Sequence, residues 1–331
     1  MNDKKVNWGV IGVGRICRGR GLAGIAAANN ARIYALASRS QGENFKACVE
    51  MYKPEKTYSD YDEMLDDPNV DAVYIALPSA LHCEWTVKAA DKKKHIMCEK
   101  PLASNEEQVN KMIKACEENG VKLLEGYAYL NSPVTQKVMS MIEEGKLGNI
   151  RLIAAHSSVL PGWEPDDNCM KFALGGGTTY EMTGYPVSLI SRVMRKDPLE
   201  IWAYGDIPKG CEVDITMCFA MRFDGPVLVT GHSSHIGAPN RHYNITGDKG
   251  RITVNNCFNM PKTIEFYDEN GKQEIIDFPY VDQFKLQFEH FGRCVLENET
   301  PNITYDDMRL NARILSEMVT QIHKKNENNL R

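Results

Sequence analysis

The sequence predicts a two-domain α/β protein, with a doubly wound parallel sheet at residues 1–125 and an α+β domain with an open, mostly antiparallel sheet at residues 126–331. Strand-like and helix-like segments alternate up to about residue 125, which is typical of a parallel sheet with right-handed crossovers. A glycine-rich turn follows the first strand, and after Gly126 many short strands are separated by turn residues. The length of 331 residues also exceeds one average core.

The strands of the first domain are short apolar runs, expected at residues 6–12, 31–38, 71–78, 94–98 and 121–126. The third of these runs lies between Asp71 and Pro78 and is apolar throughout, as in a strand covered on both faces. An alanine-rich helix is expected at residues 15–30. Another begins at Ser104, which forms a capping box with Glu107, and ends at Gly120.

The second domain combines successive strands with helices. Its strands are expected at residues 150–160, 213–223, 226–236, 241–247, 251–256 and 262–268. Turn signals such as Asp224-Gly225 and Asn270-Gly271 indicate hairpins, and therefore an antiparallel sheet. The expected helices lie at residues 133–145, 178–194, 283–298 and 305–325, and the last three are expected to cover one face of the sheet.

Composition and charge exclude several classes of protein. The chain is 43% hydrophobic and 25% charged, which is typical of a globular protein in water, and its net charge of −5 gives no reason to expect nucleic acid as a partner. The apolar runs are of strand length and no basic tract is present, so no membrane association and no signal peptide are expected. Ten scattered cysteines, among them Cys98 and Cys218 in apolar strands, predict reduced core thiols, a cytoplasmic location and no metal site.

The turn after the first strand, GVGRI at residues 12–16, fits the first part of the dinucleotide-binding loop of a Rossmann domain. Glycine permits the tight turn and lets the backbone approach a pyrophosphate at the start of the next helix. The third glycine position holds Cys17, a small substitute. The residues predicted to bind a nicotinamide dinucleotide here are Gly12, Gly14, Arg15 and Ile16. The alternative is a glycine-rich turn that binds no ligand.

The end of the second strand bears on the choice between NAD and NADP. NAD sites usually place an acidic residue about 20 residues after the glycine loop, where it binds the ribose 2′-hydroxyl. This strand instead ends at Ser38 and Arg39. A hydroxyl and a guanidinium suit a 2′-phosphate, so NADP is predicted as the preferred cofactor. The alternative is that NAD is accepted as well and that Arg39 is an ordinary surface residue.

A charged pair, Glu99 and Lys100, follows the fifth strand directly. In a doubly wound sheet, ligands bind beyond the carboxyl ends of the strands, so the pair is expected beside the nicotinamide end of a dinucleotide. Pro101 restricts Lys100 to extended geometry and thereby fixes the direction of its amine. The alternative is a solvated loop.

Four segments, in this order, carry a resemblance to a known family. They are the glycine-rich turn, ALASRS at residues 35–40, the stretch at residues 72–104 that contains EKP, and GGGTTYEMTGYP at residues 175–186. With these motifs, nearly the whole chain resembles the glucose–fructose oxidoreductase / inositol dehydrogenase (Gfo/Idh/MocA) family. The resemblance implies NAD(P)-linked redox chemistry on a sugar or related polyol. It also implies homodimers or homotetramers joined through the open sheet of the second domain.

The resemblance implies roles for individual residues as well. Lys100 would handle the proton near the nicotinamide, and a cis peptide bond is often found before the motif proline, here Pro101. The residues that would line or border the cofactor are Leu77, Pro78, Ser79, His82 and Glu99.

In the triple-glycine segment, Glu181 stands where the family usually has aspartate, and Tyr185 where it has histidine or tyrosine. Residues four apart share one helix face, so both are expected to point into the pocket of Lys100. With a tyrosine at residue 185, the segment resembles that of the aldose and dihydrodiol oxidoreductases rather than that of the inositol dehydrogenases. Trp163 and His235 are further candidates for the substrate side; the alternative for His235 is an ordinary sheet histidine.

The expected reaction is hydride transfer between NAD(P) and a sugar or related carbonyl compound. Lys100 is the first candidate for the general acid–base and Tyr185 the second, with Glu181 orienting a substrate hydroxyl. A free lysine, with a pKa of about 10.4, is a poor base at neutral pH, but partial burial beside an oxidised nicotinamide would lower that pKa. Two alternatives stay open: a non-catalytic NADP-binding sensor or regulator, and a dihydrodiol-dehydrogenase-like enzyme.

Overall fold

The computed structural model describes residues 4–160, 164 and 167–329, and it divides into two compact units. The first unit comprises Met1–Ala103, Glu107–Asn131 and Asp282–Met308. The second unit comprises Ser104–Glu106, Ser132–Val281 and Arg309–Arg331.

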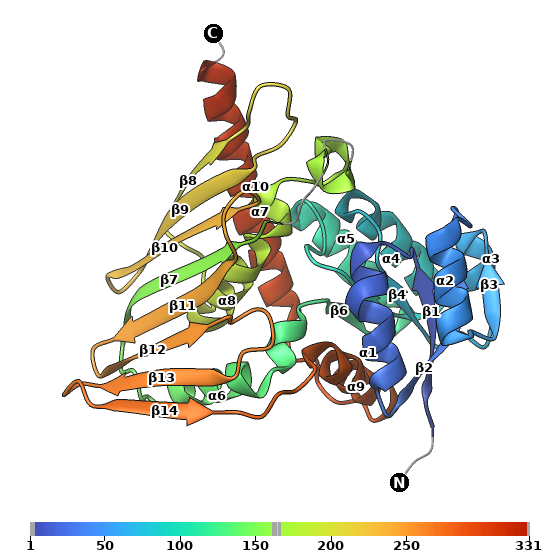
Figure 1. Cartoon of the computed structure of the whole chain (residues 1–331), viewed down its shortest axis with the longest axis horizontal. Helices are drawn as coiled ribbons and strands as arrows, with labels where there is room; N and C mark the ends of the chain where they lie inside the picture. Colours follow the sequence, from blue (N-terminus) through green and yellow to red (C-terminus); the bar gives the residue numbers. More distant parts are fainter. Residues whose placement is uncertain (1–3, 161–163, 165–166, 330–331) are drawn as a thin grey trace. The chain divides into compact units, whose positions relative to one another are not determined.

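The first unit is built on a six-stranded sheet in the order β3-β2-β1-β4-β5-β6 (Figure 1). Every neighbouring pair in this sheet is parallel. The order is that of a Rossmann domain, in which the strand order reverses between β1 and β4. This confirms the predicted parallel, doubly wound sheet. The strands are β1 (Val6–Ile11), β2 (Ala31–Ala37), β3 (Lys56–Tyr58), β4 (Ala72–Ile75), β5 (His95–Cys98) and β6 (Leu123–Glu125).

Most helical segments of the first unit connect these strands; η3 and α9 follow β6 and β14 instead. Two of them, α2 and α3, lie in a stretch for which the sequence predicted no helix, because their apolar faces are narrow: α2 buries only Phe45 and Cys48. The segments are η1 (Cys17–Gly21), α1 (Leu22–Ala27), α2 (Glu43–Tyr52), α3 (Tyr61–Leu65), η2 (Ser79–Leu81), α4 (His82–Asp91), α5 (Glu106–Asn119), η3 (Ala128–Asn131) and α9 (Gln283–Leu296).

Helix α9 corrects one expectation. The sequence placed it over the antiparallel sheet, but it packs against α1 and also contacts β1 and β2 in the first unit. The Phe288 ring of α9 stands edge-on to the Trp8 ring of β1, with 5.1 Å between ring centroids. An apolar helix face does not indicate which sheet it covers, so the sequence pattern alone cannot assign α9 to one of the two sheets.

The second unit is built on an eight-stranded sheet in the order β14-β13-β12-β11-β7-β10-β9-β8. Only β7 and β10 pair in parallel; the other pairs are antiparallel. The predicted mostly antiparallel sheet is therefore confirmed, with edge strands β8 and β14 in addition. The strands are β7 (Ile150–Ser158), β8 (Glu200–Asp206), β9 (Thr216–Phe223), β10 (Val227–Ser234), β11 (Asn240–Gly247), β12 (Gly250–Asn255), β13 (Thr263–Asp268) and β14 (Gln273–Asp277).

Helices lie along one face of this sheet. Helix α6 contacts β13, α7 contacts β9 and β10, and α8 contacts β7. At the edge strand β8, the Gln321 side chain of α10 accepts a hydrogen bond from the Ala203 N–H. The helical segments are α6 (Pro133–Glu143), η4 (Asn168–Met170), η5 (Phe172–Leu174), α7 (Thr178–Glu181), α8 (Gly184–Met194) and α10 (Tyr305–Asn329).

The single helix predicted at residues 178–194 is wrong. Helix α7 ends after one turn at Glu181, and α8 begins at Gly184. The backbone N–H groups of Met182 and Thr183 both donate to the Thr178 carbonyl, which stops the regular ladder of bonds to the fourth preceding residue. Glu181 and Tyr185 thus lie on different helices, and the expectation that they share one helix face no longer holds.

The opposite face of the second sheet is open within the described part of the chain. It carries large apolar side chains that are more than half exposed: Trp202 at 74%, Tyr204 at 58%, and Leu152 and Leu228 at 52% each. Along β8 the exposed and buried residues alternate, as expected for a sheet with one uncovered face.

Among the helices of the described ranges, none is long and apolar enough to cross a membrane.

Candidate active site

The glycine-rich turn lies at the carboxyl end of β1, against the loop that follows β4. Gly12 has a φ of +86°, and a Cβ added there would lie 2.7 Å from a Leu77 methyl carbon and 2.9 Å from the Ala76 carbonyl oxygen. Glycine is therefore required at residue 12 by both backbone conformation and space. Gly14, Arg15 and Ile16 follow and are exposed, and Arg15 and Ile16 begin the next helical segment. A turn of this kind can present backbone N–H groups to a pyrophosphate, and the binding role of these residues stays a prediction.

Ser38 and Arg39 lie at the carboxyl end of β2, the next strand in the sheet. The Ser38 hydroxyl donates a 2.8 Å hydrogen bond to the Ser40 carbonyl. The exposed Arg39 guanidinium lies over the buried Tyr61 ring, 5.8 Å from its centroid. This contact holds the guanidinium on an aromatic surface, where it can meet an anion arriving from solvent.

The loop after β4 contains Leu77, Pro78 and Ser79, and His82 begins α4. Leu77 touches the glycine turn, as described above, while Ser79 and His82 are buried. The His82 ring links this loop to the loop after β5: its Nε2 lies 2.9 Å from the Leu77 carbonyl oxygen and its Nδ1 lies 3.0 Å from the Pro101 carbonyl oxygen. That Leu77, Pro78, Ser79 and His82 border a cofactor stays a prediction.

Glu99 and Lys100 directly follow β5 at the same edge of the sheet. Glu99 is only 5% exposed, and its carboxylate accepts a hydrogen bond from the hydroxyl of Tyr74 on β4. Lys100 is half-buried, and its peptide bond to Pro101 is cis, as expected. Tyr74 was not predicted. The only signal in the sequence was a hydroxyl-bearing aromatic residue inside an otherwise aliphatic strand.

In the second unit, Glu181 ends α7 and Tyr185 lies in the first turn of α8; both are half-buried. The Tyr185 ring packs against the Phe258 ring, with 5.4 Å between centroids. His235 directly follows β10 and is 5% exposed. Trp163 lies outside the described residues.

A buried carboxylate, Asp214, supports the triple-glycine segment and was not predicted. Its Oδ2 accepts 2.9 Å hydrogen bonds from the Thr179 N–H and from the Thr179 hydroxyl. Burial raises the pKa of Asp214 to about 6, against the opposing effect of the two bonds from Thr179. A Cβ at Gly177 would lie 2.6 Å from Asp214 Oδ1. The glycine thus makes room for the carboxylate that caps α7.

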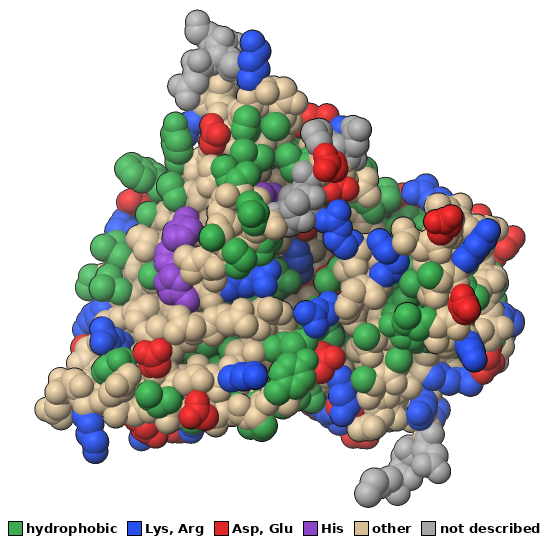
Figure 2. All heavy atoms as spheres, viewed as in Figure 1, with side chains coloured by type: hydrophobic (Ala, Val, Ile, Leu, Met, Phe, Trp, Pro, Cys, Tyr) green, Lys and Arg blue, Asp and Glu red, His purple; other side chains and the backbone are tan. Residues whose placement is uncertain are grey.

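The second unit carries a cluster of histidine side chains on its sheet. Histidine side chains gather on the open sheet (Figure 2), where His156 stacks between His232 and His242 with centroid separations of 4.0 Å and 4.5 Å. Within the described ranges, no group of three or more histidine, cysteine or acidic side chains could hold a metal ion. Cys218, expected in the core, is exposed on β9.

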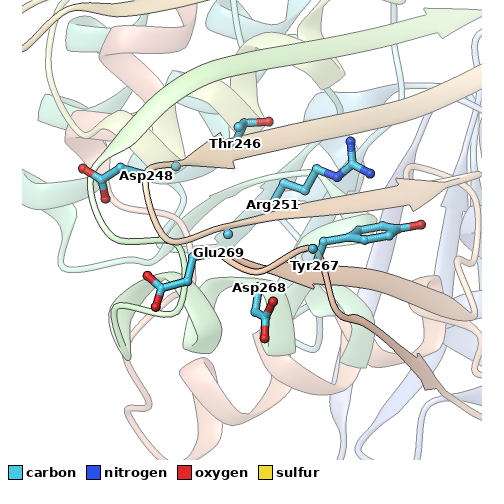
Figure 3. Close-up of a pocket in the computed structure, with 9 residues that line it drawn as sticks. Thr246, Asp248, Arg251, Tyr267, Asp268 and Glu269 are labelled. Carbon is cyan, nitrogen blue, oxygen red and sulfur yellow. The ribbon is translucent and has the colours of Figure 1, made fainter.

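A cavity of about 390 Å³ lies at the hairpins of the second sheet (Figure 3). Two of its charged lining residues are engaged: Asp248 pairs with Arg151 at 2.9 Å, and the Arg251 guanidinium lies 4.1 Å from the Tyr267 ring centroid. The lining includes none of the predicted site residues.

Comparison with known proteins decides the family. Residues 6–127 match the family described as "Oxidoreductase family, NAD-binding Rossmann fold". Residues 135–253 match the family described as "GFO/IDH/MocA C-terminal domain". The chain belongs to the GFO/IDH/MocA oxidoreductase family. The resemblance read from the motifs is thereby confirmed, and the first unit is an NAD-binding Rossmann domain of an oxidoreductase.

Relatives within this family include enzymes that act on sugars. The chain is 28% identical over 276 residues to D-xylose 1-dehydrogenase (NADP(+)) 2 of Haloferax volcanii, covering 82% of this chain and 84% of the relative. It is 24% identical over 328 residues to trans-1,2-dihydrobenzene-1,2-diol dehydrogenase of Xenopus laevis, covering 95% and 97%. A solved 3-ketoreductase from Actinomadura kijaniata, in complex with NADP and TDP-benzene, has a TM-score of 0.86 at 26% identity over 96% of this chain and 98% of that chain.

Proposed function

We propose that this GFO/IDH/MocA oxidoreductase transfers a hydride between NADP and a sugar or related carbonyl compound, with Lys100 as general acid–base. The observation that carries the proposal is the placement of Lys100. It emerges at the carboxyl end of β5, in the same row of strand ends as the glycine turn after β1 and Arg39 after β2. Dinucleotides bind along this edge of a doubly wound sheet, at the point where the strand order reverses.

When bound, the nicotinamide supplies or accepts the hydride. The residues of the chain handle the proton that accompanies it. In the reductive direction, the ammonium of Lys100 donates a proton to the oxygen of the carbonyl group; in the oxidative direction, its amine accepts the hydroxyl proton. Glu181 and Tyr185 orient substrate hydroxyls, and Tyr185 is the alternative proton donor.

Ser38 and Arg39 favour NADP over NAD. The strand ends without the acidic residue that would bind a 2′-hydroxyl, and it offers a hydroxyl and a guanidinium instead. The guanidinium rests on Tyr61, so part of its freedom is already lost before a phosphate binds. The NADP-linked xylose dehydrogenase and the NADP-bound ketoreductase among the relatives support this preference.

The test is a substrate panel monitored by NADPH absorbance. D-xylose, D-glucose and trans-dihydrobenzenediol are each offered with NADP and with NAD, to wild type and to Lys100→Met. We expect turnover of an aldose with NADP and a loss of kcat in Lys100→Met on the order of 10²–10⁴-fold, with NADPH still bound. Binding of NADPH without turnover of any substrate class would instead support a sensor. A diol turned over faster than every aldose would support a dihydrodiol dehydrogenase.

We also expect a homodimer or homotetramer that uses the open face of the second sheet. Monomeric proteins rarely leave several large apolar side chains together in solvent, and this face exposes more than half of Trp202, Tyr204, Leu152 and Leu228. The cytoplasmic location expected from the sequence stays a prediction.

A further inference from the structure

His82 occupies an unusual position in the first unit. It is 1% exposed, at the first residue of α4, and each of its ring nitrogens faces a backbone carbonyl oxygen. Nδ1 lies 3.0 Å from the Pro101 oxygen and Nε2 lies 2.9 Å from the Leu77 oxygen. Both distances are normal for an N–H group that donates to an oxygen.

Carbonyl oxygens only accept hydrogen bonds, so both nitrogens must donate for both contacts to be favourable. A neutral imidazole carries one N–H and one lone pair, and only the imidazolium carries two N–H groups. In the neutral ring, one lone pair would therefore face the lone pairs of a carbonyl at hydrogen-bond distance. We infer that His82 is a positioning residue that, as a doubly protonated imidazolium, clamps the carbonyls of Leu77 and Pro101 and thereby fixes the direction of Lys100.

A buried cation needs compensating charge, because burial alone disfavours it. The start of α4 is also a poor place for a cation, since the helix dipole is positive there. Two buried carboxylates belong to neighbouring segments: Glu99, two residues before Pro101, and Glu125 on β6, whose Oε1 accepts from the Leu102 N–H at 2.9 Å. The remaining charged groups of these elements are Lys100 and, on α4, Glu84, Lys88 and Asp91; the loop after β4 has none at residues 76–81.

The clamp completes the fixation of the segment on both sides of Lys100. Before it, the Glu99 N–H donates to the Ile75 carbonyl at 3.0 Å, and after it the Leu102 N–H is held by Glu125. The Pro101 carbonyl lies between these points and is bound by His82. Because Leu77 also touches Gly12, the same ring joins the dinucleotide turn to the lysine loop.

The inference rests on the proposed role of Lys100, but the charge of His82 is measurable without turnover. Protein labelled with ¹⁵N-histidine is recorded by NMR from pH 6 to pH 9, beside His82→Gln to assign the signal. We expect one ring with both nitrogens protonated at pH 8, absent from His82→Gln. Five of the eight histidines should give neutral-ring signals at pH 8, because burial lowers their pKa values. They are His95, His156, His232, His242 and His290. A wild-type spectrum without any imidazolium at pH 8 overturns the inference, whether or not the variant folds.

Kinetics with NADP and D-xylose test the positioning role. The matched control is His95→Gln, a histidine at the opposite end of β5 whose Nδ1 accepts from the Lys122 N–H at 3.0 Å and so has no need of a second proton. We expect His82→Gln to lose roughly 10- to 100-fold in kcat with little change in KM or in the Kd for NADPH, as for a displaced catalytic group. His95→Gln should remain near wild type. A normal kcat in His82→Gln, or equal losses in both variants, overturns the role. If the proposed role of Lys100 as general acid–base is wrong, Lys100→Met should turn over normally, and this result is distinct from either outcome for His82→Gln.

Discussion

Replacing Asp214 by asparagine should change how the stability of the protein depends on pH. The carboxylate is 3% exposed and caps α7 through Thr179, and burial raises its pKa from 3.8 to about 6. A carboxyl group whose folded-state pKa is raised binds its proton more tightly in the folded state. It therefore contributes stability that is fully present below pH 3.8 and is lost as the pH rises through about 6.

The magnitude follows from the two pKa values. A pKa that moves from 3.8 to about 6 corresponds to about 3 kcal/mol of unfolding free energy between the acidic and alkaline limits. When the pH is lowered from 8 to 5, the unfolding free energy of wild type should gain about half of this amount, roughly 1.4 kcal/mol. Asparagine is isosteric and keeps an oxygen for both Thr179 donors, but it does not titrate in this range.

The assay is urea or thermal unfolding of wild type and Asp214→Asn at pH 5, 6, 7 and 8. The unfolding free energy of wild type relative to the variant should rise as the pH falls, by about 1.4 kcal/mol in total, or roughly 2 °C in Tm for a chain of this length. Asp248→Asn is the control: hydrogen bonds from Asn149 lower the pKa of Asp248 from 3.8, so this carboxylate stays ionised from pH 5 to pH 8 and its removal should leave the pH dependence in this range unchanged. Parallel pH–stability curves for wild type and Asp214→Asn would refute the reasoning.

Three further outcomes are expected. Arg39→Ala should weaken NADPH binding about ten- to a hundredfold and leave NADH binding nearly unchanged, as measured by fluorescence titration; equal effects on both would remove the NADP preference. Tyr185→Phe and Glu181→Gln should each lower kcat or raise KM for the sugar while the Kd for NADPH stays within about twofold; a comparable loss of NADPH affinity would contradict their substrate role. Trp202→Glu should shift the protein toward monomers in light scattering, since it buries a charge in the proposed interface; an unchanged mass would argue against that face.

The first unit could be predicted closely because each of its main signals is local. The glycine turn, the apolar run of β4 and the EKP segment each follow from a few consecutive residues, and the parallel order follows from their alternation with helices. Helix α9 could not be assigned to its sheet, because the aromatic contact between Trp8 and Phe288 joins residues 280 positions apart. Strand β3 has only three residues and two of them are exposed, so it gives no usable pattern.

The sequence offers candidate site residues where a charge stands at a strand end, and it gives little sign of residues that support another residue. Arg39 and Lys100 stand out as charges at strand ends. Tyr74 and Asp214 do not, because each acts on a buried hydrogen-bond partner, Glu99 or Thr179, that only the folded chain brings near. A buried polar residue must find such a partner, so an isolated Tyr or Asp within an apolar segment is the one sequence sign of this role.

The break between α7 and α8 shows why spacing alone misplaced Glu181 and Tyr185. A four-residue spacing predicts a shared face only while each backbone N–H donates to the fourth preceding carbonyl. Here the cap supplied by Asp214 stabilises a single turn, and the chain then restarts at Gly184, a residue with poor helix propensity. Glu181 is thus tied to the triple-glycine turn and its buried carboxylate, whereas Tyr185 is tied to α8 and the Phe258 ring. Loss of the Asp214 cap should therefore disturb the position of Glu181 more than that of Tyr185.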